Sequence, residues 1–404
     1  MTQEITKDPL SETVNFNLNN YKKTLETKFN SQGFPTTSHE NWLYWAPDQL
    51  HSALLNPCKQ TYDLNDESAD ICIVNGVIVS VSKKLNELKI VETTPSDKLQ
   101  KLNLDVSSSS ISILNSMHAD KLIMITVTDN LKDTITISNI STCDESNVST
   151  VCKVLILAKE KSRSNFVVNH NSDLKEENAV NTSFHIIAKK ESSISINHIF
   201  KDQIAVSFFH SMIYLYENSK CSHLTFVTNS KLVRHDTEAH FYEEGADLKC
   251  SGVGILKKDE QFYNHLKINH YAKDCTAQQF FKNILDEVAI AEFSGLVFVH
   301  EGAHGVDSTQ SNKTLLLSNN ARVLSRPQLK IDADDVQCAH GSTIGQLNPE
   351  EIFYITSRGL TTKQAKALLV FGFAEEIIIN IKDEILKSTL ESYIKESLSE
   401  INIQ

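Results

Sequence analysis

The chain has 404 residues and a mass of 45.4 kDa, which is enough to bury one large core or several small ones. Its formal net charge of -12 argues against nucleic acid as a partner, because phosphate contacts draw mainly on Lys and Arg. The longest apolar runs are far shorter than the ~20 residues that a membrane span needs. We therefore expect neither nucleic-acid nor membrane binding.

The N-terminal segment is polar and contains early acidic residues. It lacks the apolar stretch and the small-residue cleavage site of a secretory signal, and its acidic residues do not fit an organellar transit peptide. These features predict a cytoplasmic protein.

The eight cysteines are scattered along the chain without a Cys-x-x-Cys pair. This spacing opposes a zinc finger or a thioredoxin-type redox motif. In the cytoplasm we expect reduced thiols that pack as small hydrophobic side chains, with Cys338 as the one candidate for another role.

Residues 1–65 are predicted to form an N-terminal helical domain. The apolar residues from Leu18 to Phe29 follow a helical spacing that ends at Gly33.

Residues 66–347 are predicted to form a β-rich core. Short β-type runs alternate with Asn, Asp, Ser and Gly turns, and helical crossovers are scarce, so a solenoid or a sandwich is expected. Only 12 glycines occur in the chain, which excludes a left-handed hexapeptide β-helix. Periodicity alone leaves the other β-helices and the sandwich open. The runs are Ile71–Ser82, Lys121–Thr128, Ser193–Phe200, His223–Asn229, Leu296–Glu301 and Thr314–Leu324.

Residues 348–404 are predicted to form a C-terminal helical domain. Asn348 caps a first helix that ends at Gly359, and Thr361 begins a second through a capping box. Two interpretations of the apolar stripes are open: the helices bury one another, or they leave a face for a partner. The second helix carries Ala365, Leu368, Leu369, Gly372, Phe373 and Ile377 on one face, and a third carries Ile385, Leu386, Leu390, Ile394 and Leu398.

Cys338 and His340 stand two residues apart in a segment that is typical of a strand. Side chains alternate along a strand, so both should project from the same face. A thiol and an imidazole can both bind a transition metal, but two ligands do not complete a metal site. The pair therefore predicts half of a site, completed by a substrate or by another chain.

The segment from His300 to His304 matches the His-Glu-x-x-His zinc protease signature, which requires a helix. It follows a β-type run and contains Gly302, and the third ligand is missing, since Asp307 stands where the metzincin continuation requires Gly. We therefore predict that this segment is not a helix and is not a zinc protease site.

Several segments resemble the SufD members of the SufB/SufD family, which are scaffold subunits of SUF iron-sulfur cluster assembly. The resemblance covers nearly half the chain, and its segments follow one another in the family's order. They are Gly33–Pro47, His270–Ala289, Gln310–Leu347 and Phe353–Ile377. Cys338-Ala339-His340-Gly341 is the SufD pattern, where SufB carries a Glu-His-Glu-type run.

The resemblance implies a right-handed parallel β-helix flanked by N-terminal and C-terminal helical domains. It also implies a non-catalytic subunit that pairs with SufB, with His340 facing SufB where a transient nascent cluster forms, and with Cys338 in a less settled role. A homodimer without SufB stays open. The C-terminal helices would bind the SufC ATPase, with Leu368, Leu369 and Phe373 as candidate contacts.

The sequence also bears on ATP hydrolysis, flavin binding and metal chemistry. No phosphate-binding loop occurs, so ATP hydrolysis must come from another subunit. A flavin is associated with the family's assembled complex, but nothing in the sequence marks a flavin site. A stand-alone β-solenoid metalloenzyme that uses Cys338 and His340, or the His300–His304 segment, is the alternative.

Overall fold

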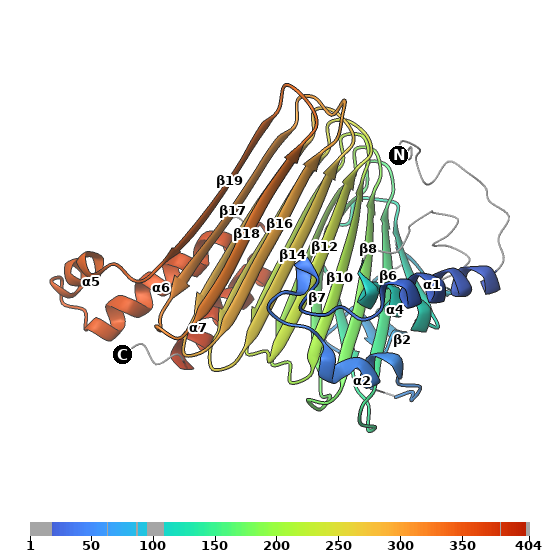
Figure 1. Ribbon diagram of the computed structural model, residues 1–404, viewed down its shortest axis with the longest axis horizontal. Coiled ribbons are helices and arrows are strands. Elements are labelled where there is room, and N and C mark those ends of the chain that lie inside the picture. The colour runs from blue at the N-terminus through green and yellow to red at the C-terminus, as the bar shows by residue number, and fades with distance from the viewer. Residues whose placement is uncertain (1–17, 63, 86–87, 95–108, 380, 401–404) are drawn as a thin grey trace.

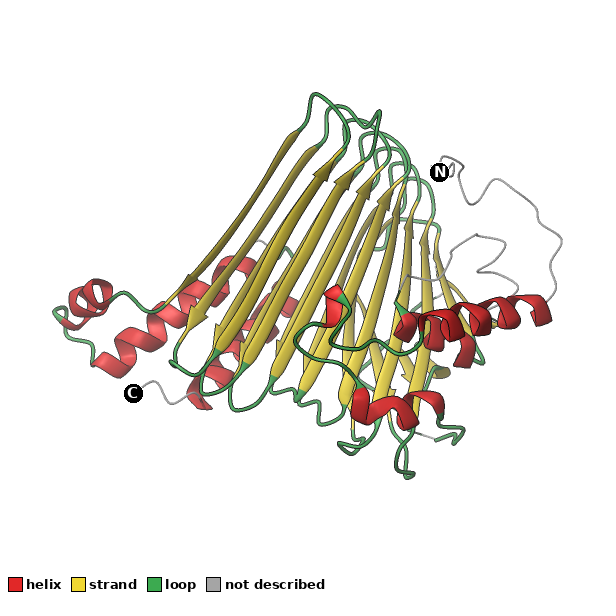
Figure 2. Cartoon of the chain, viewed as in Figure 1, coloured by secondary structure: helices red, strands yellow, loops and turns green. Residues whose placement is uncertain are grey.

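The computed structural model describes residues 18–62, 64–85, 88–94, 109–379 and 381–400 (Figure 1). Strands make up 46% of the structure and helices 20%. The strands form a parallel β-solenoid of about eight turns, with helices at both ends of the chain (Figure 2). The predicted fold class is therefore confirmed.

Each turn of the solenoid contributes one strand to each of two sheets, and all pairs are parallel except β1 with β2 and β3 with β4. Sheet I contains, in spatial order, β19 (Gln337–Gly345), β17 (Asp307–Leu316), β15 (Thr276–Leu285), β13 (Asp247–Leu256), β11 (Lys220–Thr228), β9 (Ser193–Lys201), β7 (Arg163–Ser172), β5 (Ile135–Ser141), β1 (Ile71–Val74) and β2 (Val77–Val81). Sheet II contains β18 (Arg322–Ile331), β16 (Ile290–Val299), β14 (Gln261–His270), β12 (Leu232–Phe241), β10 (Val206–Leu215), β8 (Ala179–Ala188), β6 (Ser149–Ala158), β4 (Leu122–Val127) and β3 (Leu88–Thr93).

One corner of the solenoid is turned by a residue with positive φ that recurs once per turn. Its backbone N–H donates to a carbonyl of the next turn, as from Asn218 to Glu244 at 3.0 Å and from Asp274 to His304 at 2.9 Å. Asn, Asp and Gly adopt this conformation with the least strain, which is why a chain without a sequence repeat can still coil regularly. The residues are Lys161, Glu191, Asn218, Gly245, Asp274, Gly305 and Asp335.

The interior of the solenoid holds the main core. Alternate residues of each strand point inward, so aliphatic and aromatic side chains from both sheets meet there. Phe184, Ile196 and Phe209 are examples that are completely buried.

Helices cover the outer face of each sheet. The N-terminal helices pack on sheet II around Phe208, and the C-terminal helices pack on sheet I around Phe226 and Val253 (Figure 1). None of the helices in the described ranges combines the length and the apolar character of a membrane span. The helices are α1 (Leu18–Gln32), η1 (Glu40–Trp42), η2 (Asp48–Leu50), α2 (His51–Leu55), α4 (Ser110–His118), α5 (Pro349–Thr356), α6 (Thr362–Ile378) and α7 (Glu384–Glu400).

The helix signals predicted at both ends of the chain are confirmed. The first helix ends just before Gly33, which has a φ of +67°. The Asn348 side chain accepts a hydrogen bond from the backbone of Glu350, and Thr361 forms the expected capping box. The helix after Asn348 ends at Thr356, earlier than predicted. The division into three domains stays a prediction, and residues 1–17, which bear on a leader sequence, lie outside the described residues.

Two of the predicted strand runs are each two strands. Ile71–Ser82 is a hairpin, because Asn75 and Gly76 both have positive φ and turn the chain between β1 and β2. Thr314–Leu324 contains the end of β17, a turn and the start of β18. The Asn75-Gly76 pair and the polar residues Ser318 to Asn320 were turn signals in the sequence that periodicity alone does not use.

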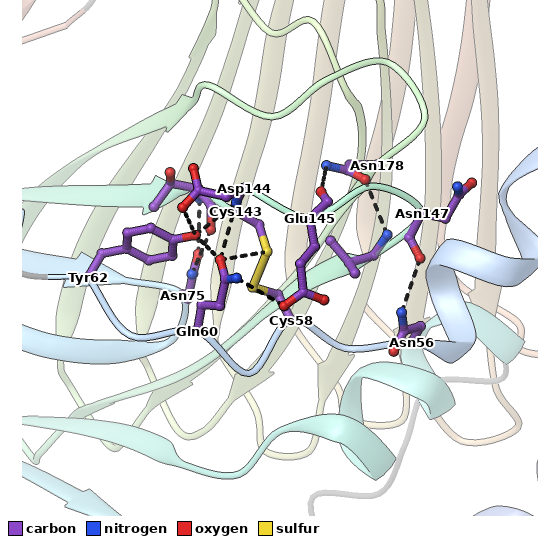
Figure 3. The surroundings of a disulfide bond; sticks show 12 residues. Asn56, Cys58, Gln60, Tyr62, Asn75, Cys143, Asp144, Glu145, Asn147 and Asn178 are labelled. Atoms are coloured by element: carbon purple, nitrogen blue, oxygen red, sulfur yellow. Dashed lines mark hydrogen bonds between the residues drawn. A yellow bond between two sulfur atoms is a disulfide. The ribbon is translucent and has the colours of Figure 1, made fainter.

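The expectation that most cysteines are free thiols is confirmed, since six of the eight are free, but one pair departs from it. Cys58 and Cys143 form a disulfide with a Cα–Cα distance of 6.6 Å (Figure 3). It joins the segment after α2 to the turn between β5 and β6. Side-chain hydrogen bonds flank it, including Gln60 to Glu145 at 3.0 Å. Since the two cysteines are 85 residues apart, no spacing rule in the sequence pairs them.

Reduction of this disulfide is expected to lower the free energy of unfolding by about 2–4 kcal/mol, because it releases a long loop in the unfolded chain. The measurement is urea unfolding with and without dithiothreitol. Cys58→Ser is the control, and its unfolding midpoint should not respond to the reductant. A wild-type midpoint that is equally insensitive would contradict the disulfide.

Candidate functional site at the end of the solenoid

Cys338 and His340 lie on β19, the edge strand of sheet I at the C-terminal end of the solenoid (Figure 1). Their partners in register on β17 are Ser308 and Gln310, which are buried. Cys338 packs against the solenoid core, and His340 two residues later projects from the same face. The predicted strand is confirmed, and it places both side chains on the inner face of the last turn.

The two side chains differ in exposure. Cys338 is half-buried, and burial raises the pKa of its thiol, an effect that the backbone N–H of Ser308 opposes. The thiol form therefore dominates at neutral pH, and a metal or a base would have to remove its proton. His340 is exposed, because no further turn follows β19 in the described chain. The imidazole is the more accessible ligand of the two.

The acidic residues before β19 lie in the corner turn that connects it to β18. Asp332, Asp334 and Asp335 are exposed, and Asp335 is the left-handed residue of this corner. The described residues contain no group of three or more His, Cys, Asp or Glu side chains arranged to hold a metal ion. Within the described chain, Cys338 and His340 therefore have no third ligand.

The His300–His304 segment is a turn after β16 and not a helix, as predicted, and the resemblance to SufD implied the same turn. His300 stacks on Phe298, with ring centres 3.6 Å apart, and its other neighbour is Tyr271. His304 forms a hydrogen bond through Nδ1 with the backbone oxygen of Asp334 at 2.8 Å. Gly305 has a φ of +70°, and a side chain there would collide with Asp274. The two histidines therefore have structural contacts and lack the helical geometry of a zinc protease.

The candidate contacts for a partner ATPase lie on different sides of α6. Leu368 is 54% exposed, whereas Leu369 is half-buried. Phe373 packs against the cluster over sheet I, and the Lys282 ammonium lies 4.2 Å from its ring centre. The predicted single apolar face is wrong, because Ala365 is buried while Leu368 points away from the solenoid. The buried residues of α6 are Ala365, Val370, Ala374, Ile377 and Ile378.

Exposed aromatic side chains on α5 form a surface that the sequence interpretation did not single out. Phe353 is 73% exposed and Tyr354 is 58% exposed, and both line a shallow apolar depression with Pro349. On α7, Leu386 is buried as predicted, but Ile385 is 80% exposed. The sequence contained a signal for this exposed surface. Phe353 and Tyr354 are consecutive and project in different directions, so a short helix cannot bury both against one neighbour.

A polar cavity on the outer face of sheet II was also missed. It has a volume of about 590 Å³ and lies between the segment around Trp42 and strands β12 to β18. The Arg234 guanidinium lies 3.4 Å from the centre of the Trp42 ring, and its Nε lies 3.1 Å from Asp236 Oδ1. The alternation of Arg234, Asp236 and Glu238 along β12 was the available signal, because it places three charges on one face.

Burial and ion pairing oppose each other among these charges. Burial raises the pKa of Asp236, but Arg234 and neighbouring histidines hold it below its usual value. The pKa of Glu292 is also lowered. Burial raises this pKa, but His265 and Arg326 together outweigh the effect, and Arg326 Nη2 donates to the Glu292 carboxylate at 3.0 Å. Arg234 and Asp236 in the cavity wall, and Arg326 and Glu292 outside it, therefore form ion pairs that offset their burial.

Comparisons with known proteins agree with this architecture. Residues 140–373, more than half the chain, match the family model described as SUF system FeS cluster assembly, SufBD core domain. Iron-sulfur cluster assembly protein SufD of Escherichia coli is 30% identical over 199 residues, which cover 49% of this chain and 47% of that protein. SufD of Bacillus subtilis is 26% identical over 254 residues, covering 60% and 56%.

A SufBD family protein of Synechocystis is 36% identical over 172 residues, which cover 42% of this chain and 37% of that protein. The chain thus spans about half the length or less of these curated relatives. The family model covers the solenoid strands from the end of β5 to β19, together with α5 and most of α6. The chain therefore belongs to the SufBD core family of SUF-system iron-sulfur cluster assembly proteins, and within it is SufD-like.

Proposed function

We propose that this chain is a non-catalytic scaffold subunit that pairs with a SufB-like subunit and contributes His340 to the site of nascent cluster formation. The observation that carries the proposal is the position of His340, an exposed imidazole on the inner face of an edge strand at the end of the solenoid. An edge strand offers unpaired backbone groups to a second chain. A partner that pairs there would bring its own side chains next to His340.

The chemistry of the pair fits a cargo that must be released. A neutral imidazole binds iron without the added negative charge of a thiolate. Two side chains from this chain hold an iron-sulfur cluster less firmly than a full set of cysteines would. Cys338, whose burial favours the thiol, has the secondary role in this proposal. The cluster is then a transient species shared with the SufB-like subunit.

The same proposal assigns binding of a SufC-like ATPase to the C-terminal helices. Leu368 on α6 and the aromatic pair Phe353 and Tyr354 on α5 leave apolar surface exposed on the side away from the solenoid. Apolar side chains of this kind suit a groove on a partner. Leu369 and Phe373 would act as the half-buried base of this surface. We place the assembled complex in the cytoplasm.

Co-expression with SufB and SufC candidates, followed by size-exclusion chromatography, tests the proposal. We expect the three chains to elute together and the complex to carry iron and acid-labile sulfide after reconstitution. Elution of this chain alone under the same conditions, together with a metal-dependent activity of its own, would contradict the scaffold function.

A further inference from the structure

The inward-facing residues of β17, the next-to-last strand of sheet I, are mostly polar, whereas earlier strands of sheet I place both apolar residues and histidines such as His198 and His223 inward. Leu248 and Val227, for example, occupy inward positions in earlier strands of sheet I. A buried polar atom without a hydrogen-bond partner is unfavourable, so unpaired oxygens at this end of the solenoid could accept hydrogen bonds from additional donors. The inward-facing residues of β17 are Ser308, Gln310, Asn312 and Thr314, and each leaves one buried oxygen without a hydrogen-bond partner in the described structure.

Gln310 belongs to a directional ladder of amides. It is in register with Gln279 on β15, and its Nε2 donates to Gln279 Oε1 at 3.2 Å. Gly295 on sheet II makes room for this amide, because a Cβ at Gly295 would lie only 2.8 Å from Gln310 Nε2. Gln310 itself is 2% exposed, so its position is fixed by packing. Its Oε1 is left as a buried acceptor without a described partner.

His340 is the next residue in the same column. It is the register partner of Gln310 on β19, and adjacent strands of a sheet lie about 4.8 Å apart. Because His340 is exposed at the end of the solenoid, rotation of its side chain is unhindered on the outer side. We propose that Gln310 is the positioning residue of His340, with Gln310 Oε1 accepting the N–H of one imidazole nitrogen.

A hydrogen bond to Gln310 would determine which ring nitrogen of His340 is free to bind a metal. A neutral imidazole carries one N–H, and a hydrogen bond from it fixes which nitrogen keeps the lone pair. Protein ligands to metals are commonly oriented by a second partner of this kind, and loss of that partner typically weakens metal binding 10–100-fold. The lone pair of His340 would thus be held facing out of the open end. The use of this lone pair for metal binding rests on the proposed function of His340.

The test is the tautomer ratio of His340 in the full-length chain, read from the ring nitrogen shifts of ¹⁵N-histidine-labelled protein. His340→Gln assigns the signal. In the wild type we expect about a tenfold excess of one neutral tautomer. Gln310→Met should return the ratio to that of a histidine in an unstructured peptide.

Two further variants separate positioning from general disturbance. Ser308→Ala removes a buried hydroxyl from the neighbouring column and should leave the ratio unchanged. Gly295→Ala displaces the Gln310 amide without altering either residue, and it should shift the ratio as Gln310→Met does. An identical ratio in the wild type, Gln310→Met and Gly295→Ala would overturn the inference.

The result is independent of cluster assembly. If the tautomer ratio responds to Gln310 but His340→Ala complexes still form clusters, then the positioning is correct and the proposed function fails. If the ratio is unchanged but clusters require His340, then the proposed function stands and Gln310 has only a packing role.

Discussion

Replacing His340 by alanine is expected to reduce iron-sulfur cluster maturation, in cells that depend on this machinery, to nearly the level of a deletion strain. The side chain is exposed on an edge strand, so its loss should change the free energy of unfolding by no more than about 0.5 kcal/mol. The chain should therefore fold and assemble normally while lacking its accessible ligand. The measurement is genetic complementation together with the elution profile of the complex.

Two variants on the same strand serve as comparisons. Thr343→Ala changes an exposed residue on the opposite face of β19 and should complement like the wild type. Cys338→Ala should have an intermediate, milder effect, because the half-buried thiol is held protonated. Full complementation by His340→Ala would mean that the histidine is a structural residue.

Introducing a charge at Leu368 is expected to weaken the proposed binding of a SufC-like ATPase by roughly 30-fold or more, which corresponds to the ~2 kcal/mol of an interface hot spot. Leu368→Asp alters a side chain that points away from the solenoid, so α6 should stay folded. Ile385→Asp is the matched control, since it places the same charge at an exposed apolar residue of α7. The measurement is the dissociation constant between the purified chain and SufC.

Point substitutions are preferable to removal of all the C-terminal helices. α6 and α7 cover apolar residues on the outer face of sheet I, including Phe226, Val253 and Ile284. A truncated chain would expose this face and lose stability for reasons unrelated to SufC. Equal affinity of Leu368→Asp and the wild type for SufC would contradict the proposed surface.

Local signals predicted the local structure well. Asn348, Thr361 and Gln364 acted as the predicted helix caps, because capping depends on neighbouring residues alone. The strand around Cys338 and His340 was also predicted from alternation. Periodicity could not distinguish a right-handed solenoid from a sandwich, because the strands of both folds alternate inward and outward residues with a period of two. The resemblance to SufD supplied that choice.

Features that depend on contacts between distant residues could not be predicted. The disulfide joins cysteines 85 residues apart, and the polar cavity brings together Arg234, His265 and Gln328 from three strands of sheet II. The orientation of α6 was misjudged because a helix rich in apolar residues on all sides has no single stripe, and packing on sheet I decides which side is buried. The proposed role of Gln310 depends on the register of β17 with β19, which the sequence alone does not give.

The most direct test of a role for His340 in cluster formation is the iron and acid-labile sulfide content of the co-purified complex after reconstitution, compared between the wild type and His340→Ala. We expect an intact complex of unchanged subunit composition in both, with iron and sulfide severely reduced in the variant. Equal iron and sulfide in the two complexes would contradict it.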